Sequence, residues 1–390
     1  MAERGTRFSL AWRLLAFERR RLAAAVAGVT FAVVLILVQI GFYGAMTGSA
    51  TKVQRNLDAD LIMVPAGFEY FGSVHDFARV RLMQAAAVPG VAEVLPLYAT
   101  LVNFKNVDTG YYRSIMAIGV EPGRHELLLP GVLAHQNSLM VAGHILFDRR
   151  SLTAYYGDVV HRFATKGPFT ALITGRPVTV DGLFNLGTSF IAFGNILMSA
   201  QTYFALQPDL KPSLPNFGLI RLKPGADPVA VRDRIKRTLH AGDVIVETKQ
   251  AFIQREIDYW NKTAAIGFIF IVGVLMGVLV GSVIVYQILF TDVTEHLPEY
   301  AVLKAMGYPN RFFTGTVFEQ SLILSVLGFV PGLIISWLIY RYTAATTGYT
   351  MDLTVLTAIG VLALTAAMCV VAGLAAMRHL SRADPAELFR

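Results

Sequence analysis

The residue types that usually carry catalysis or bind metals are sparse in this chain and are not spaced for either role. The sequence holds eight histidines and one cysteine, Cys369, which lies in an apolar run, so no disulfide can form within the chain and no cysteine-based metal cluster exists. His125 and His144 have no partners at ligand spacing. A membrane enzyme with an extracytoplasmic catalytic domain is therefore disfavoured, and we expect no catalytic residue and no metal site.

Sequence motifs for nucleotides and hydrolytic chemistry are also missing. The chain contains no G-x-x-x-x-G-K-[ST], no H-E-x-x-H, no G-x-S-x-G and no G-x-G-x-x-G. The net charge of +7 could suit nucleic acid, but the arginines gather beside hydrophobic runs and no basic face is interleaved with aromatic residues. We expect no cofactor on this chain and no nucleic-acid partner.

One segment between two hydrophobic runs, residues 291–311 (TDVTEHLPEYAVLKAMGYPNR), is longer and more apolar than a simple turn requires. Pro298 and Glu299 suit the start of a short helix, and Gly307 suits its end. We term this the coupling segment and predict that it docks on another protein. Its candidate contact residues are Glu299, Tyr300, Val302, Leu303, Lys304, Met306 and Gly307.

Small residues recur at helical spacing in two of the hydrophobic runs. Gly273, Gly277 and Gly281 form a G-x-x-x-G-x-x-x-G ladder, which lets another helix backbone approach closely. We predict close helix packing there, near the two-fold axis of a homodimer. In a later run Pro331 should kink the helix. That run also carries a stripe of small residues, Ser321, Ser325, Gly328, Gly332 and Ser336.

Glu319 is an acid inside an otherwise apolar run. An ionisable residue within a membrane span is a functional-site hypothesis by default. It lies eight residues past Arg311, or about 12 Å along a helix. The alternative, which the position favours, is a shallow acid that pairs at the membrane rim with Arg19, Arg20 or Arg21.

Composition and hydropathy identify the elements that hold these residues. Apolar residues make up 54% of the 390 positions and charged residues only 16%, against about 25% in soluble domains. Four runs are long enough to cross a membrane. The predicted fold class is an α-helical membrane protein with four transmembrane helices and a large α+β periplasmic domain between the first and second. The predicted divisions are a cytoplasmic amphipathic helix at 1–21, spans at 22–46, 263–290, 312–340 and 353–377, the periplasmic domain at 47–262, the coupling segment at 291–311, a short periplasmic loop at 341–352 and a cytoplasmic tail at 378–390.

The distribution of arginine predicts the orientation of the spans. Basic residues cluster before the first span, between the second and third, and after the fourth, whereas the loop between the third and fourth holds only Arg341. The positive-inside rule then assigns both termini and the coupling segment to the cytoplasm. We expect a multi-pass protein of the bacterial inner membrane. A cleaved signal peptide is the disfavoured alternative for the first run, because its apolar core is long and three more spans follow.

Flanking segments give further local predictions. Residues 7–20 have an apolar face with a narrow polar arc and suit an interfacial helix, or else a simple extension of the first span. Within the periplasmic domain, residues 59–67 suit a strand, 74–87 suit an amphipathic helix, and Asp227 suits the cap of a later helix. Residues 125–215 are left unassigned. A helix starting near Gln250 is expected to run straight into the second span.

Several stretches resemble the MacB/FtsX-type permeases, the type VII ABC transporters. E-Y-A-V-L-K-A-M-G (299–307) is similar to the E-I-G-x-R-K-A-x-G segment of that family, and SRADPAELFR (381–390) is similar to its R-x-x-D-P-A-E tail. Leu303 is a departure, since the wider family often carries arginine there. DevC-type permeases are more similar still, through LDADLIMV (57–64), FARVRLMQAAAVPGV (77–91), FNLGTSFIAFGN (184–195) and HLPEYAVLKAMGY (296–308). The resemblance covers nearly the whole chain.

The resemblance implies a non-enzymatic membrane subunit of a tripartite exporter. Such a subunit forms a homodimer, binds a separate ATPase that carries ATP and Mg, and engages a periplasmic membrane-fusion adaptor that leads to a TolC-like outer-membrane channel. The substrate, a lipid, a glycolipid or a peptide, stays open. Two alternatives share the fold: a lipoprotein-releasing permease, and an FtsX-like regulator of a cell-wall hydrolase, whose extracytoplasmic domain is usually smaller than this 216-residue insert.

Overall fold

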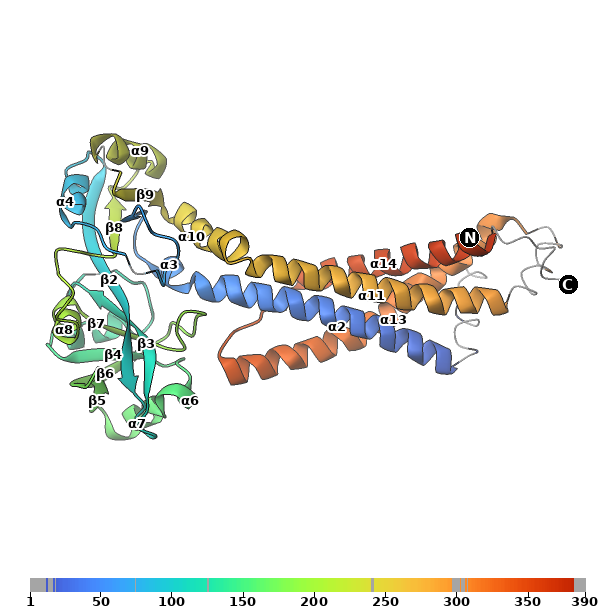
Figure 1. Cartoon of the computed structure of the whole chain (residues 1–390), viewed down its shortest axis with the longest axis horizontal. Helices are drawn as coiled ribbons and strands as arrows, with labels where there is room; N and C mark the ends of the chain where they lie inside the picture. The colour runs from blue at the N-terminus through green and yellow to red at the C-terminus, as the bar shows by residue number, and fades with distance from the viewer. Residues whose placement is uncertain are drawn as a thin grey trace. The chain divides into compact units, whose positions relative to one another are not determined.

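The computed structural model describes residues 12, 17, 19–73, 75–124, 126–239, 242–296, 302, 306 and 308–381. The chain divides into two compact units, whose elements are labelled in Figure 1. The helical unit comprises Met1–Gly44, Gly267–Tyr342 and Met351–Arg390. The sheet domain comprises Ala45–Ile266 and Thr343–Thr350. Most of the helix predicted at 1–21, and His125, lie outside the described residues.

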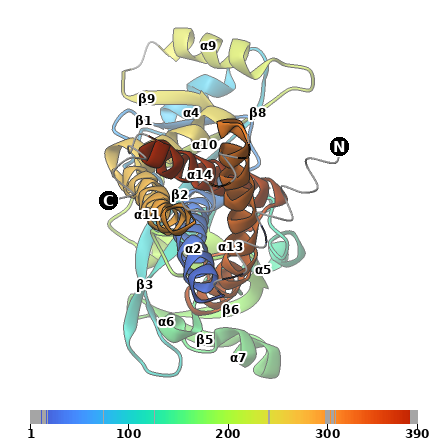
Figure 2. The same ribbon diagram turned by 90° about the vertical axis from the view of Figure 1, so that its right-hand side faces the viewer.

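Four long helices carry the predicted spans (Figures 1 and 2): α2 (Arg19–Ala50), α11 (Ile266–Glu295), α13 (Asn310–Thr347) and α14 (Val355–Ser381). All four are long and apolar enough to cross a membrane. The shortest, α14, has 27 residues, or about 40 Å at about 1.5 Å per residue, against a hydrocarbon layer of about 30 Å. Pro331 lies inside α13, which continues on both sides of it.

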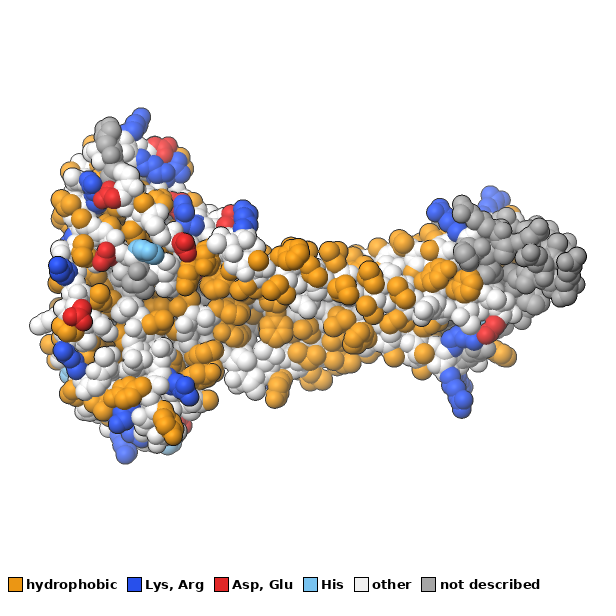
Figure 3. All heavy atoms as spheres, in the orientation of Figure 1, with side chains coloured by type: hydrophobic (Ala, Val, Ile, Leu, Met, Phe, Trp, Pro, Cys, Tyr) orange, Lys and Arg blue, Asp and Glu red, His pale blue; other side chains and the backbone are white. Residues whose placement is uncertain are grey.

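The apolar side chains of the helical unit lie both inside it and on its surface. Ala32, Ile36 and Leu324 are fully buried between helices. Phe268 and Leu275 of α11 are nevertheless 65% and 61% exposed. Figure 3 shows hydrophobic side chains covering the visible face of the long helices. Such a surface is unfavourable in water and suits lipid, so the chain is a helical membrane protein.

The sheet domain is built on a nine-stranded sheet with the order β3-β7-β4-β6-β5-β2-β8-β1-β9. Neighbours pair antiparallel except β3 with β7 and β4 with β6, which are parallel. The strands are β1 (Leu61–Pro65), β2 (Val91–Lys105), β3 (Tyr112–Val120), β4 (His144–Asp148), β5 (Phe169–Ile173), β6 (Arg176–Phe184), β7 (Asn195–Ser199), β8 (Phe217–Leu222) and β9 (Val244–Thr248).

Strand β2 belongs to both halves of this sheet. Its residues 91–97 pair with β8, and residues 98–105 pair with β3. Because β3 also pairs with β2 at the far end of the strand order, six strands from β3 to β2 close on themselves. The remaining strands, β8, β1 and β9, extend the first half of β2. A single 15-residue strand therefore connects two parts of the domain.

Short helices cover the sheet: α3 (Lys52–Asn56), α4 (Val80–Ala86), η1 (Leu133–His135), α5 (Gln136–Leu139), α6 (Thr153–Tyr156), α7 (Val159–Lys166), α8 (Ala200–Leu206), α9 (Pro228–Leu239) and α10 (Lys249–Asp258), followed by the π-helical turn η2 (Tyr259–Thr263). Leu82 of α4 and Ile235 of α9 are fully buried with Leu61, Ile220 and Val246 of the strands. Residues 125–215, left unassigned from sequence, form β4 to β7 and α5 to α8.

Two local predictions are wrong, whereas the strand predicted at 59–67 is observed as β1 and the cap at Asp227 is also observed. The helix predicted at 74–87 is only α4, because the backbone N–H groups of Phe77 and Arg79 donate to carbonyls of the 213–215 loop instead of to a helix. The helix from α10 does not run straight into the second span: it passes through η2, and Ala265 has a left-handed backbone with φ 54°. Asp227 caps α9, accepting from the N–H of Val229 at 3.0 Å.

Candidate functional site

The described part of the coupling segment presents apolar side chains to the surroundings. Val302 and Met306 are 61% and 67% exposed, and the Met306 N–H donates to the Val302 carbonyl at 3.0 Å, as in one helical turn. The other predicted contact residues lie outside the described residues: Glu299, Tyr300, Leu303, Lys304 and Gly307. Docking of a partner on this segment stays a prediction. Val302 and Met306 are the two described side chains that are exposed for such an apolar contact.

Polar contacts tie together the helices on either side of the coupling segment. Gln320 of α13 donates to Asp292 of α11 at 3.1 Å, and both side chains are buried. His296 Nδ1 lies 2.9 Å from the Asp292 carbonyl oxygen. Arg21 of α2 donates to both carboxylate oxygens of Glu295, at 2.6 and 2.8 Å. These pairs were not predicted from the sequence. Their only local sign was an acid, Asp292, and an amide, Gln320, inside otherwise apolar helices.

Glu319 does not have the partner predicted from sequence. Arg21 pairs with Glu295 instead, because the end of α11 lies beside the start of α2. Among the described residues, Glu319 Oε2 is buried without a hydrogen-bond partner. A buried acceptor without a partner is unfavourable by about 1–3 kcal/mol, so the hypothesis of a functional intramembrane acid stays open.

The glycine ladder of α11 faces other helices of the same chain. A Cβ added to Gly277 would lie 2.9 Å from Ile36 Cγ1 of α2, and one on Gly281 would lie 2.7 Å from the Ala32 Cβ. At Gly273 the added atom would overlap the Gln39 side chain. Close packing at this ladder is therefore observed within one chain. The dimer contact stays a prediction, and it must use a face that α2 does not occupy.

The small-residue stripe of α13 also packs closely, and again on α2. A Cβ on Gly328 would lie 2.5 Å from Val29 Cβ, and one on Gly332 would lie 2.6 Å from Val33 Cγ1. Thr30 Oγ1 donates to the Gly328 carbonyl at 3.1 Å. Helix α2 is thus held between α11 and α13 through backbone approaches that only small residues permit.

A buried acid lies where the sheet domain leads into α11. Glu256 of α10 is fully buried; its carboxylate accepts from the backbone N–H of Phe71 at 2.9 Å and from Trp260 Nε1 at 3.0 Å. Burial raises the pKa of Glu256 to about 7, although these bonds oppose the shift. Gln54 of α3 is also fully buried and lies close enough to the Glu256 carboxylate to oppose the rise in its pKa, although neither polar atom of its side chain makes a hydrogen bond of standard geometry among the described residues.

The loop between β6 and β7 contacts segments that follow two of the long helices, α2 and α13. It is anchored by the buried Asp148, which accepts from the Gly187 N–H at 2.7 Å. Lys52, just after α2, donates to the Thr188 carbonyl at 3.3 Å, and burial lowers the pKa of its ammonium group. Tyr349, just after α13, stacks on Phe190 with ring centroids 4.9 Å apart.

Histidine and acid residues pair in the sheet domain, but not as a metal site. His144 Nδ1 lies 2.9 Å from Asp181 Oδ2, a partner 37 positions away that sequence analysis missed. Burial pushes the pKa of Asp181 up, but hydrogen bonds from His144 and Ser138 outweigh it and leave the pKa below its usual value. In the described ranges, no group of three or more His, Cys, Asp or Glu could hold a metal ion.

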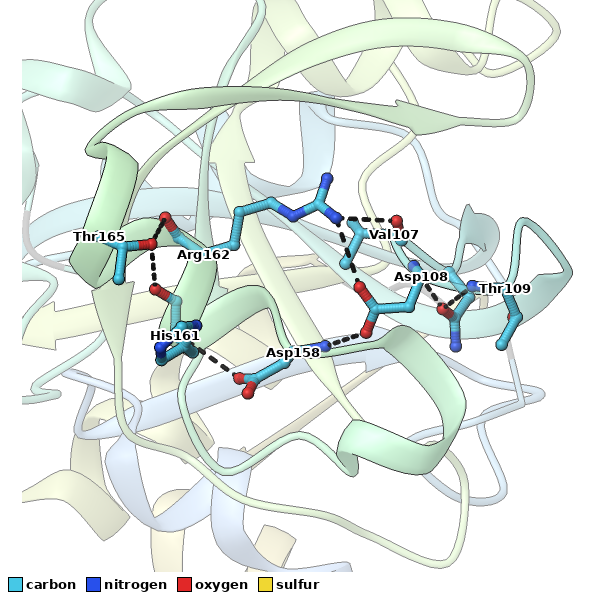
Figure 4. Close-up of polar contacts among 8 residues, drawn as sticks. Val107, Asp108, Thr109, Asp158, His161, Arg162 and Thr165 are labelled. Carbon is cyan, nitrogen blue, oxygen red and sulfur yellow. Dashed lines mark hydrogen bonds and ion pairs between the residues drawn. The ribbon is translucent and has the colours of Figure 1, made fainter.

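A second cluster of acids, a histidine and an arginine has a structural role (Figure 4). Asp158 accepts from the backbone N–H of His161 at 3.0 Å, so it caps α7 and does not orient the imidazole. Asp108 accepts from the Asp158 N–H at 2.8 Å and from Arg162 at 3.3 Å, which fixes the β2–β3 turn to α7. The polar groups of this cluster therefore stabilise the β2–β3 turn and the start of α7 through local hydrogen bonds.

Comparison with known proteins identifies the C-terminal helices. Residues 271–385 match the family described as FtsX-like permease C-terminal. An "Uncharacterized ABC transporter permease" of Mycobacterium tuberculosis strain H37Rv, Rv2563, is 23% identical over 341 residues, which cover 84% of this chain and 85% of the relative. A second from the same strain, Rv0072, is 22% identical over 331 residues, covering 84% of each chain.

Among solved structures, the periplasmic region of MacB from Actinobacillus actinomycetemcomitans aligns with 51% of this chain and 94% of its own, with a TM-score of 0.36 and 12% identity. The extracellular domain of YknZ from Gram-positive bacteria aligns with 49% of this chain and 99% of its own, with a TM-score of 0.35 and 12% identity. Residues 271–385 are therefore similar to the FtsX-like permease C-terminal family, and most of the chain is similar to proteins named as ABC transporter permeases.

Proposed function

We propose that this FtsX-like ABC transporter permease is the membrane subunit of a tripartite exporter in the bacterial inner membrane. It relays ATP-driven motion from a separate ATPase to a periplasmic adaptor, through which a TolC-like outer-membrane channel is reached. The exported substrate is a lipid, a glycolipid or a similar molecule. ATP and Mg belong to the ATPase, and this chain contributes no catalytic group.

The observation that carries the proposal is the setting of the coupling segment. Val302 and Met306 are exposed apolar side chains between α11 and α13. Asp292, near the end of α11, accepts a hydrogen bond from Gln320 of α13, and α11 is bound to α2 through Glu295. A partner that moves this segment therefore moves a connected set of helices, and not a loose loop. The arginine distribution supports an orientation with both termini in the cytoplasm.

The contact is tested by placing charges in it. Val302→Asp with Met306→Asp should abolish co-purification of the ATPase with the permease and stop export, because an unpaired charge buried in an apolar contact is costly. Both residues are exposed, so membrane insertion should be unaffected. The matched control is Val80→Asp with Met83→Asp on α4, where the side chains are 55% and 48% exposed in the sheet domain. The control should retain the ATPase.

The proteins that the permease and its variants bind distinguish the proposed function from its alternatives. Full ATPase binding by the coupling-segment variant would remove the docking role from residues 296–308. Capture of a membrane-fusion adaptor by the intact permease would support the tripartite assembly. Capture of a lipoprotein carrier or of a cell-wall hydrolase instead would favour the alternatives that share this fold.

A further inference from the structure

Five aromatic side chains from four separate segments form a row in the sheet domain. The ring of Tyr259 stacks on that of Tyr70 with centroids 4.6 Å apart, and Tyr70 meets the edge of Trp260 at 5.6 Å. Trp260 lies 6.2 Å from Phe190, which stacks on Tyr349 at 4.9 Å with an interplanar angle of 13°. Each ring therefore contacts the next along an unbroken series, which we term the aromatic row.

The aromatic row is not part of a buried core. Phe190 is 40% exposed, and the other four rings are partly exposed. None of the five belongs to the buried hydrophobic clusters of the domain. A contiguous aromatic surface of this kind is typical of a contact site, since aromatic rings carry much of the energy of apolar recognition.

Chain connectivity keeps two members of the aromatic row near the ends of two membrane-spanning helices. Tyr349 lies two residues after Thr347, the end of α13, and so within about 7 Å of it at about 3.6 Å per residue. Trp260 lies six residues before Ile266, the start of α11, and so within about 22 Å. Tryptophan and tyrosine are enriched at the surface of bilayers, where one end of the ring is apolar and the other is wet.

The polar edges of two rings are, however, turned to the protein. Trp260 Nε1 donates to the buried carboxylate of Glu256 at 3.0 Å, and the Tyr349 hydroxyl donates to the Ser189 carbonyl at 3.3 Å. A simple interfacial anchor keeps these groups for water and lipid head groups. Here they fix the orientation of the rings instead, and the partly exposed sides of the row that the rings do not cover in one another remain for a ligand. Fixed faces lose little conformational entropy on binding.

We propose that the aromatic row binds the alkyl chain of a phospholipid from the leaflet next to the sheet domain. An alkyl chain has no hydrogen-bonding groups and gains by displacing water from apolar faces, while its head group stays solvated. The inference goes beyond the proposed export function, since it requires only that the chain is inserted in a membrane. Neither the ATPase nor the adaptor takes part, so the two proposals fail independently.

The test is photolabelling of the full chain in phosphatidylcholine nanodiscs that contain a phosphatidylcholine with a diazirine on its acyl chain. Mass spectrometry gives the label on peptides around residues 190 and 349, and label on the exposed face of α11 serves as the measure of bulk lipid contact. Phe190→Ala with Tyr349→Ala should lower the ratio of row label to α11 label about tenfold, equivalent to about 1.4 kcal/mol. Phe190→Tyr with Tyr349→Phe keeps the rings and should keep the ratio.

Two controls keep the test decisive. Tyr111→Ala removes a ring that is 71% exposed on the β2–β3 turn, and it should leave the ratio unchanged. A chain with Trp12→Phe and Trp337→Phe retains Trp260 as its one tryptophan, and lipids brominated on the acyl chain should quench its fluorescence. An unchanged ratio in the double alanine variant, or unquenched Trp260 in the intact row, would overturn the proposal.

Discussion

Arg21, near the start of α2, donates two hydrogen bonds to Glu295, the last residue of α11, although the two are 274 positions apart. Reversing one charge, as in Arg21→Glu, puts two acids at this contact. We expect a lower thermal unfolding midpoint at low ionic strength, and a smaller difference at high salt, because salt screens exposed charges.

The exchanged pair, Arg21→Glu with Glu295→Arg, is the control for this prediction. Its thermal unfolding midpoint should return most of the way to that of the unmodified chain, because opposite charges face each other again. If the exchanged pair is as unstable as the single reversal, the contact does not contribute to the assembly of these helices.

Gly277 and Gly360 give a matched pair of glycine substitutions. A Cβ at Gly277 meets Ile36 at 2.9 Å, whereas one at Gly360 of α14 meets nothing within 4 Å. Gly277→Leu should destabilise the helical unit by about 1–3 kcal/mol through overpacking, and Gly360→Leu should not. The measurement is thermal unfolding in detergent.

The same pair separates packing within a chain from packing between chains. Because the Gly277 contact lies inside one chain, its loss of stability should not depend on protein concentration. A midpoint that recovers as concentration rises would assign the ladder to the dimer interface instead.

Features that depend on short stretches of chain were predictable from sequence. The four long helices follow from apolar runs, and the cap at Asp227 follows from its place before Pro228. Both are decided by neighbours along the chain, so no knowledge of the tertiary structure was needed.

Features that depend on distant partners were not predictable. Arg21 meets Glu295 of α11 and not Glu319 of α13, and no local pattern encodes how the three helices pack against one another. His144 finds Asp181 only because β4 and β6 pair in parallel. Residues 125–215 were unassigned because β7 is buried along its whole length and pairs with β3 and β4, so its sequence lacks the alternation of a half-exposed strand.

Glu256 gives the sheet domain a defined pH dependence. Its pKa is about 7 in the folded chain against an ordinary value of 4.5, because burial disfavours the charged form. Between these two values the folded chain holds a proton that the unfolded chain has lost. The free energy of unfolding should therefore fall as pH rises from about 4.5 to about 7, and level off above. Glu126, whose pKa burial also raises to about 7, acts in the same direction.

The variant Glu256→Gln isolates this contribution. The difference in unfolding midpoint between pH 5 and pH 8 should be smaller than in the unmodified chain, since the amide does not titrate. Absolute stability is expected to drop at low pH, because a glutamine has one acceptor oxygen for the two N–H donors of Phe71 and Trp260. An unchanged pH profile would mean that Glu256 is ionised in the folded protein.

The helix expected to run from near Gln250 straight into the second span is interrupted at Ala265, between the sheet domain and α11. Its φ of 54° is a left-handed conformation that costs an alanine about 1–2 kcal/mol, whereas glycine adopts it freely. Glycine also loses more entropy on folding, by about 0.4–1 kcal/mol. Ala265→Gly should therefore be neutral or stabilising.

The neighbour Ala264 has a φ of −78°, so Ala264→Gly carries only the entropic loss and should destabilise. The measurement is the thermal unfolding midpoint of each variant of the full chain. Equal losses of stability at both positions would mean that α10 and α11 form one continuous helix in the membrane-inserted protein.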